Sequence, residues 1–214
     1  DLTVMLQQHL PVSNVLTPIS VVGNESLAAN VLLGKQHFYD AADDRLARDN
    51  YMSCASCHND GGQDGRVWDI THLGEGLRNT ISLRGHGSGH GILHWTANFD
   101  EVQDFENQIR TLALGTGLMT QAQFDSATDP LGTPKSGLNA DLDALADYVN
   151  SLVEMDPSPH RDSAATMSAG AVSGQSLFVS RGCVGCHSGS SLTDSSSATL
   201  HDVGTIDPDS GTRI

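Results

Sequence analysis

Cysteine and histidine occur together in one short pattern, Cys-x-x-Cys-His, which the chain contains twice. The two copies hold all four cysteines of the 214 residues and comprise Cys54, Cys57, His58, Cys183, Cys186 and His187. Two thiols one helical turn apart can each form a thioether with one haem vinyl group, and the adjoining histidine can then bind the iron. A zinc site does not require a histidine directly after both cysteine pairs, a thioredoxin-like pair would need a βαβ pattern, and disulfides would leave the histidines without a role. The pattern therefore predicts two covalently bound haem c groups, with His58 and His187 as the proximal iron ligands.

The second axial ligand of the first iron separates two kinds of chemistry. An iron with two protein ligands is suited to electron transfer, whereas an iron with one can bind peroxide. The candidate residues are His72, His86, His90, His94 and Met119. We expect a histidine, with His72 and His94 equally favoured and Met119 behind them. Peroxide reduction would also need a group that moves a proton, and the candidate carboxylates are Glu75, Asp104 and Glu106.

The second iron has fewer candidates for a second ligand. Only 27 residues, 188–214, follow His187, and none of them is a methionine. His201 could contact a haem propionate or the iron itself. Met155 and Met167 could reach this haem only from the segment between the two motifs.

The elements that position the motifs are helices. Each motif follows a Gly-x-x-x-Phe step, which predicts a short helix before each haem and a repeated domain. Apolar residues between Glu25 and Asp40 indicate one helix face toward a core. The clearest helix is LNADLDALADYVNSLVEM, which Asn139 can cap and which carries one apolar stripe. Residues 59–93 are rich in glycine and predict long loops.

The chain is therefore expected to be an all-α protein of two cytochrome c-type domains with long irregular loops. The first domain covers residues 1–156 and holds haem 1. A polar, small-residue linker covers 157–172. The second domain covers 173–214, holds haem 2, and is predicted to be incomplete, which leaves open whether Ile214 is the natural end.

Composition limits the partners. Lys and Arg total 11 against 26 Asp and Glu, a formal net charge of −15. This charge argues against nucleic acid and anionic membrane surfaces as partners and favours a redox protein with a basic docking face, although acidity can also serve only to keep a secreted protein soluble. No apolar run approaches the roughly 20 residues of a membrane span. The start, DLTVMLQQHL, does not have the form of a signal peptide. Because haem c is attached outside the cytoplasm, we expect a periplasmic or extracellular protein whose signal has been removed.

Longer stretches around and between the motifs match a known family. They are LGKQHFYDAADDRLARDNYMSCASCHND, GLRNTISL, HWTANFDEVQDFENQ, GQSLFVSRGCVGCHSG and LHDVGT. In content and order they resemble the bacterial di-haem cytochrome c peroxidase family, which includes the MauG-type enzymes. The resemblance implies that peroxide meets the N-terminal haem and that the C-terminal haem relays electrons to it through Trp95. It also implies a homodimer, a distal role for His72 or Gln108, and a calcium ion near Asn79.

Three departures separate the chain from the family pattern. WTAN replaces the usual WDGR, Leu118 stands where a catalytic glutamate is expected, and the stretch that supplies a far-side ligand to haem 2 is absent from 188–214. The sequence therefore predicts a di-haem c-type cytochrome that carries out periplasmic electron transfer. The alternative is an active peroxidase or MauG-type oxidising enzyme at haem 1, with haem 2 relaying electrons through Trp95.

Overall fold

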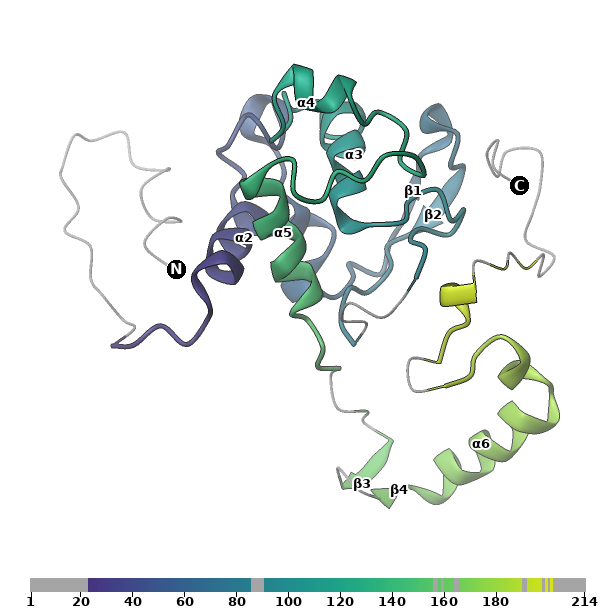
Figure 1. The fold of residues 1–214 in the computed structure, drawn as a ribbon. Helices are drawn as coiled ribbons and strands as arrows, with labels where there is room; N and C mark the ends of the chain where they lie inside the picture. Colours follow the sequence, from purple (N-terminus) through teal and green to yellow (C-terminus); the bar gives the residue numbers. More distant parts are fainter. Residues whose placement is uncertain are drawn as a thin grey trace.

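The computed structural model describes residues 23–85, 91–155, 158, 160–163, 166–189, 192–197, 199 and 201. The ligand candidates His86 and His90 lie outside the described residues, as do 1–22 and 202–214 with the predictions made for the two ends. Residues 23–155 form a main body, and a smaller part, between 158 and 201, projects from it (Figure 1). No described helix combines the length and the apolar character that crossing a membrane requires.

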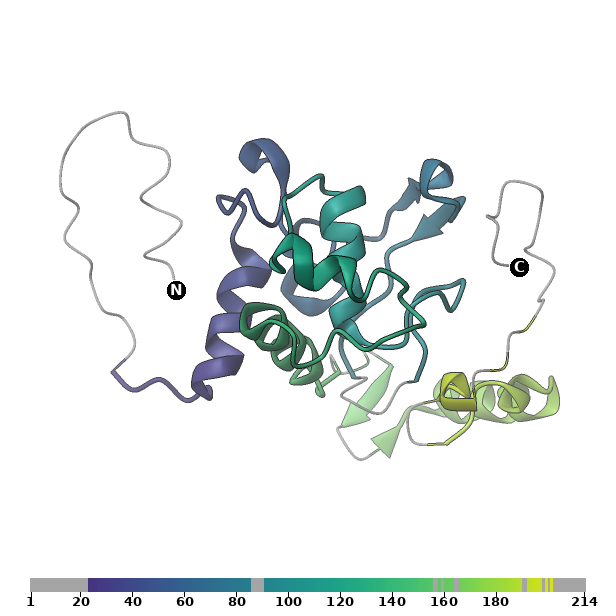
Figure 2. The same ribbon diagram turned by 45° about the horizontal axis from the view of Figure 1, so that its top comes forward.

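Two long helices pack side by side in the main body (Figures 1 and 2). They are α2, Ala29–Tyr39, and α5, Ala140–Asn150. The Asn139 side chain accepts hydrogen bonds from the backbone N–H groups of Asp141 and Leu142, so it caps α5 as predicted. α2 begins later than the pattern suggested, at Ala29 rather than Glu25. Instead, the Glu25 carboxylate accepts the backbone N–H of Leu27 in a turn before the helix.

The hydrophobic core lies between these helices and the chain that joins them. Its centre is the ring pair Phe38 and Tyr148, whose centroids are 5.1 Å apart in an edge-to-face arrangement. The buried cluster consists of Phe38, Leu46, Ile109, Leu118, Met119, Leu142, Leu145 and Tyr148. Cys54 and Ala55 of the first Cys-x-x-Cys-His motif pack against this cluster. The first motif is therefore attached directly to the core.

A buried carboxylate connects the short helix α3, Phe105–Thr111, to the loop that follows it. Glu106 is fully buried and accepts hydrogen bonds from the backbone N–H groups of Leu118 and Met119, at 3.0 and 3.2 Å. Arg110 Nε donates to the same carboxylate at 2.8 Å. The loop also needs glycine, because Gly117 has φ of 93° and a Cβ atom there would lie 2.1 Å from Glu106 Oε1. The loop then leads to α4, Gln121–Asp125.

Two small antiparallel hairpins add strands to a mainly helical fold, a feature that an all-α prediction did not include. In the main body, β1, Val67–Asp69, pairs with β2, Leu77–Asn79. In the projecting part, β3, Arg161–Ser163, pairs with β4, Thr166–Met167. The last helix, α6, Ala169–Ser180, is capped by the Ser168 side chain. The segment 157–172, expected as a linker, thus contains a hairpin and the first turn of α6.

Candidate functional site

The first Cys-x-x-Cys-His motif forms a tight turn. Residues Cys54–Ser56 make one turn of 3₁₀ helix, and the backbone N–H groups of Cys57 and His58 both donate to the Cys54 carbonyl, at 3.3 and 3.0 Å. Neither cysteine is in a disulfide. Burial raises the pKa of the Cys54 thiol to about 11 and also raises that of Cys57. Two neutral thiols one turn apart, with the imidazole directly behind them, match the requirement for attaching one haem.

The ring of His58 is held by the backbone. Its Nδ1 lies 3.3 Å from the carbonyl oxygen of Gly62. Burial lowers the pKa of His58, and the carbonyl groups of Gly62 and Ile81 oppose this effect. A neutral imidazole that donates from Nδ1 carries its lone pair on Nε2, the nitrogen available to a metal.

The second motif repeats this geometry in the projecting part of the chain. Residues Cys183–Gly185 form a 3₁₀ turn after α6, and the backbone N–H of His187 donates to the Cys183 carbonyl at 2.9 Å. His187 Nδ1 lies 3.0 Å from the carbonyl oxygen of Leu192, so its Nε2 also carries the lone pair. Unlike their counterparts in the first motif, Cys183 and His187 are exposed. The two motifs therefore share ligand geometry and differ in surroundings.

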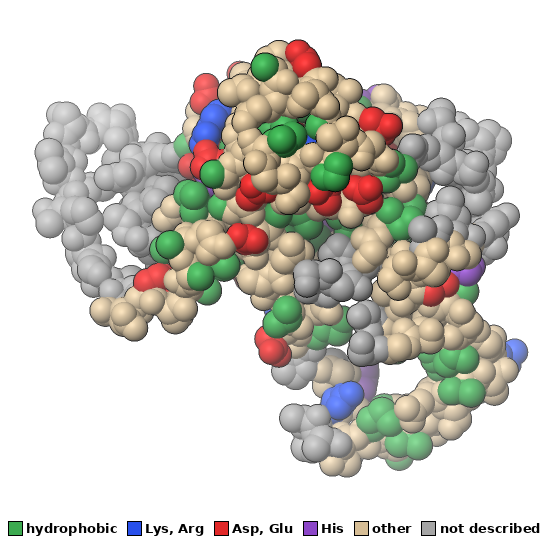
Figure 3. Space-filling view, in the orientation of Figure 1, with side chains coloured by type: hydrophobic (Ala, Val, Ile, Leu, Met, Phe, Trp, Pro, Cys, Tyr) green, Lys and Arg blue, Asp and Glu red, His purple; other side chains and the backbone are tan. Residues whose placement is uncertain are grey.

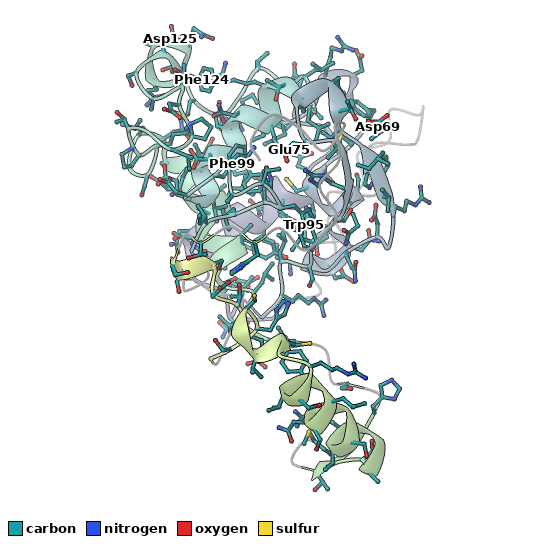
Figure 4. All side chains as sticks on the ribbon, turned by 90° about the vertical axis from the view of Figure 1, so that its right-hand side faces the viewer. Asp69, Glu75, Trp95, Phe99, Phe124 and Asp125 are labelled. Atoms are coloured by element: carbon teal, nitrogen blue, oxygen red, sulfur yellow. The ribbon has the colours of Figure 1, made fainter. Side chains whose placement is uncertain are left out.

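A third imidazole, His94, lies close to the first motif. Its ring packs between Phe99 and Phe105, with centroid separations of 4.4 and 4.8 Å. Its Nδ1 lies 2.8 Å from Asn98 Oδ1, and among the described residues its Nε2 has no hydrogen-bond partner. Figure 4 shows Phe99, Glu75 and Trp95 in the same part of the main body. His94 thus presents an unpaired nitrogen inside a largely apolar setting.

The electrostatics link His94 to His58. Burial lowers the pKa of His94, hydrogen bonding to Asn98 and the charge of Glu75 raise it, and the nearby His58 and Arg78 lower it again. For the charge of His58 to act on His94, the two rings must share one region of the structure. His58 and His94 therefore lie in the same region of the main body, one within the motif and one outside it.

Known proteins resemble this chain. A family model for the di-haem cytochrome c peroxidase, of the MauG type, matches residues 28–165, well over half of the chain. The chain belongs to the di-haem cytochrome c peroxidase family. Membership in this family implies haem c cofactors and a redox function of the cytochrome type.

Beyond the family model, the similarity of this chain to known proteins is limited. No curated protein sequence matches the chain. Among solved structures, hydrazine synthase from Kuenenia stuttgartiensis, pressurised with 20 bar of xenon, is similar at 24% identity and a TM-score of 0.49. The match covers 80% of this chain and 54% of that one, so it spans about half the length of that chain.

For a di-haem cytochrome c peroxidase family member, the remaining far-side candidates lie in very different places. His72 is exposed, on the 3₁₀ turn Thr71–Leu73 beyond β1. Met119 is 3% exposed and packs in the hydrophobic core with Leu118, the residue at the expected glutamate position. Gln108 is half-buried on α3. Of the described candidates, His94 is the one that combines partial burial with an unpaired nitrogen near His58.

Trp95, the family's candidate inter-haem residue, is 56% exposed. Its Nε1 donates to the backbone carbonyl of Asn79 at 3.0 Å, which ties the His94 loop to β2. The same loop meets the segment after the second motif, because a Cβ atom on Gly91 would lie 2.5 Å from the carbonyl oxygen of Ser195. Asn79 itself is exposed, and calcium binding there stays a prediction.

One cluster near the second motif involves His201. Its Nε2 lies 2.7 Å from Asp194 Oδ2, and both side chains lie close to Cys186, with one ligand atom from each of the three within 4.8 Å of the others. The Asp194 carboxylate therefore holds the His201 ring close to Cys186, and a propionate role for His201 stays a prediction.

The sequence analysis missed the polar residues behind His94. They are Thr96, Asn98 and Arg78, which gather around Glu75. The local signal for Asn98 was its position four residues after His94, within the WTAN stretch noted as a departure from the family pattern. Glu75 was singled out as a candidate carboxylate, but its hydrogen bond to Asn98 joins residues 23 apart in sequence and could not be read from spacing.

Proposed function

We propose that this protein is a di-haem c-type cytochrome that transfers electrons outside the cytoplasm, with haem attached covalently at both motifs. The observation that carries the proposal is the repeated geometry of the two motifs. Each has two cysteines free of disulfides on one turn and an imidazole whose Nδ1 is committed to a backbone carbonyl. This donor set suits haem, because the thiols would hold the ring and Nε2 would bind the iron.

A bound haem would supply a one-electron change at its iron, and the chain would set the conditions for it. Cys54 and Cys57 would fix the first ring against the core, while His58 would bind the iron from below. On the far side, His94 is the residue we assign as second ligand. Its support is the lone pair on Nε2, its apolar setting between Phe99 and Phe105, and its proximity to His58.

Electrons would pass between the two haem sites by way of Trp95. Support comes from the exposed indole next to His94 and from the contact of Gly91 with Ser195, which brings the segment after the second motif onto the same loop. The external partner would be a redox protein with a basic docking face. The net charge of −15 supports this, and Asp and Glu outnumber Lys and Arg on the visible face in Figure 3.

A second candidate function is peroxide reduction at the first haem. It is favoured by the carboxylate of Glu75 behind His94, since such a chain could support His94 as a proton acceptor if its Nε2 were not bound to iron. The two other candidate carboxylates already have hydrogen-bond partners. Glu106 accepts from Arg110 and from two backbone N–H groups, and Asp104 accepts from Lys135. Leu118, at the expected glutamate position, is buried in the core.

Spectroscopy of the purified protein tests the proposal. Two haems per chain by the pyridine haemochrome assay, retained after denaturation, would support covalent attachment at both motifs. The double variant Cys54→Ala/Cys57→Ala should lose one haem, and Cys183→Ala/Cys186→Ala should lose the other. A low-spin first haem that does not react with peroxide, in either the oxidised or the half-reduced protein, would support electron transfer. High-spin iron with peroxide turnover would favour the second candidate.

Replacement of the two histidines identifies the far-side ligand. His94→Ala should convert the first haem to high spin, whereas His72→Ala should leave its spectrum unchanged. The opposite result would exclude His94 as the ligand.

A further inference from the structure

A continuous polar chain runs behind His94. Asn98 Oδ1 lies 2.8 Å from His94 Nδ1, and the other end of the same amide, Nδ2, donates to Glu75 Oε1. Thr96 Oγ1 donates to the second oxygen of Glu75 at 2.7 Å. Glu75 and Thr96 are buried, and Asn98 is half-buried.

We propose that Asn98, oriented by Glu75, is the positioning residue that fixes the ring and tautomer of His94 toward the iron of the first haem. The inference rests on the proposed function, because it assumes a haem at the first motif. It goes beyond that function by assigning roles to Asn98 and Glu75.

The hydrogen-bond chemistry of the chain permits one arrangement. An ionised carboxylate can only accept, so the NH₂ group of Asn98 must face Glu75. The amide oxygen must then face His94, and an oxygen can only accept. His94 must therefore donate from Nδ1, which leaves the lone pair on Nε2 as an iron ligand requires.

Glu75 is itself held in place. Beyond the hydroxyl of Thr96, Arg78 Nε lies 3.8 Å from Glu75 Oε2 and supplies a compensating positive charge. A buried carboxylate with a hydroxyl, an amide and a guanidinium around it has little freedom to turn. Because Glu75 is held in place, its hydrogen bond to Asn98 fixes the amide, and the amide in turn orients the imidazole of His94.

The backbone of the loop 93–99 brings the side chains of His94 and Asn98 together. His94 and Ala97 both have positive φ, 65° and 51°, a conformation uncommon for residues other than glycine. The turn is closed by a hydrogen bond from the Leu93 N–H to the Phe99 carbonyl at 2.8 Å. Strained backbone of this kind persists where surrounding contacts over-determine it and is concentrated at functional sites. Here those contacts include the His94 to Asn98 bond.

Substitutions at Asn98 separate a positioning role from a structural one. Asn98→Leu removes the acceptor, so the first haem should shift from low spin to mainly high spin, while the second haem stays unchanged. Loss of such a supporting partner typically weakens metal binding by about 10- to 100-fold. Asn98→Asp combined with Glu75→Gln keeps an acceptor facing His94, because the amide at position 75 can donate to the carboxylate at position 98, so the first haem should stay low-spin. A negative charge in direct contact with the His94 ring should shift the reduction equilibrium of the first haem about tenfold toward the oxidised form. This shift corresponds to a reduction potential lower by about 59 mV for one electron.

A matched control is available in Gln103, a buried amide whose Nε2 donates to Asp143 at 2.9 Å, on an element that makes no hydrogen bond to His94 within the described part of the chain. Gln103→Leu should lower stability without changing the spin state or potential of either haem.

Two results would contradict the inference. If Asn98→Leu folds with both haems and keeps a low-spin first haem, Asn98 does not position the ligand. If Asn98→Leu does not fold, an unchanged potential in the double variant Asn98→Asp/Glu75→Gln overturns the inference by itself. Absence of haem from the unmodified chain would overturn the proposed function and the inference together, whereas two haems with unchanged spectra in both variants overturn the inference alone.

Discussion

Gly34 of α2 lies so close to Ala144 of α5 that a Cβ atom on the glycine would be 1.8 Å from the Ala144 carbonyl oxygen. The same atom would lie 2.9 Å from Tyr148 Cβ. No L side chain fits at this distance, so the two helices can approach only because residue 34 has none. This contact sets the position of α2, and the first Cys-x-x-Cys-His turn contacts that helix.

We expect Gly34→Ala to destabilise the protein by about 1–3 kcal/mol or more, because the added methyl forces the helices apart. Gly174 is the matched control, since it occupies the corresponding place in the second Gly-x-x-x-Phe step and a Cβ atom there would meet nothing within 4 Å. Gly174→Ala, in the middle of α6, should stabilise by roughly 0.5–1 kcal/mol. Urea denaturation followed by far-UV circular dichroism measures both. Equal effects of the two substitutions would contradict this prediction.

A buried ion pair holds the loop before α5. Lys135 is fully buried, and its Nζ lies 2.7 Å from Asp104 Oδ1. We expect Lys135→Met to destabilise by about 3–5 kcal/mol, because the carboxylate would be left buried without its partner. Arg48→Ala, which removes an exposed pair with Asp49, should change stability by less than about 1 kcal/mol. Similar losses in the two variants would contradict a special role for the buried pair.

Acidification should lower the stability of the protein because it weakens the ion pairs that Arg45 makes. Its guanidinium contacts Asp43 at 2.7 Å and Asp141 at 2.8 Å. Hydrogen bonding to Arg45 lowers the pKa of both carboxyls below their unfolded value of about 3.9. Their stabilising effect is therefore fully present above about pH 4 and is lost as the pH falls through the lower folded values.

Urea midpoints measured between pH 7 and pH 2.5 test this dependence. The variant Arg45→Gln should be less stable at pH 7 and should lose less stability on acidification than the unmodified protein. Parallel curves for the two proteins would show that these pairs do not contribute to the acid sensitivity.

The two tryptophans differ in the role we assign to them. Trp95→Phe should slow electron transfer between the two haem sites, measured by rapid reduction of one haem and observation of the other. Trp68→Phe is the control, because Trp68 is also exposed and its Nε1 donates to Asp64 at 3.0 Å. A rate unchanged in Trp95→Phe, or slowed equally in both variants, would exclude Trp95 from the relay.

Local patterns predicted the parts of the fold that local physics decides. Asn139 caps α5 as expected, and Leu142 and Leu145 of the predicted stripe are buried. The contrast between Gly34 and Gly174 could not be predicted, because the two share one local pattern and differ only in what packs against them. The β1–β2 hairpin was missed in a glycine-rich stretch without alternating apolar residues.

The candidate site likewise has parts that local sequence patterns predict and parts that they do not. The cysteine and histidine motifs are contiguous in sequence, so their geometry followed from spacing alone. The pair Glu75 and Asn98 joins residues 23 apart through a loop with no periodic pattern. Contacts of this kind depend on the tertiary fold, and the sequence favoured His72 and His94 equally without distinguishing an exposed ring from a half-buried one.

The unequal exposure of the two cysteine pairs bears on how the mature protein is assembled. Cys54 packs against the core and has a thiol pKa of about 11, so little reactive thiolate forms before haem arrives. Cys183 is open to solvent. In an oxidising compartment, we expect the second pair to close prematurely into a disulfide more readily than the first. Biogenesis would then depend on an accessory reductant chiefly for Cys183 and Cys186, and the order of haem insertion would follow from that chemistry.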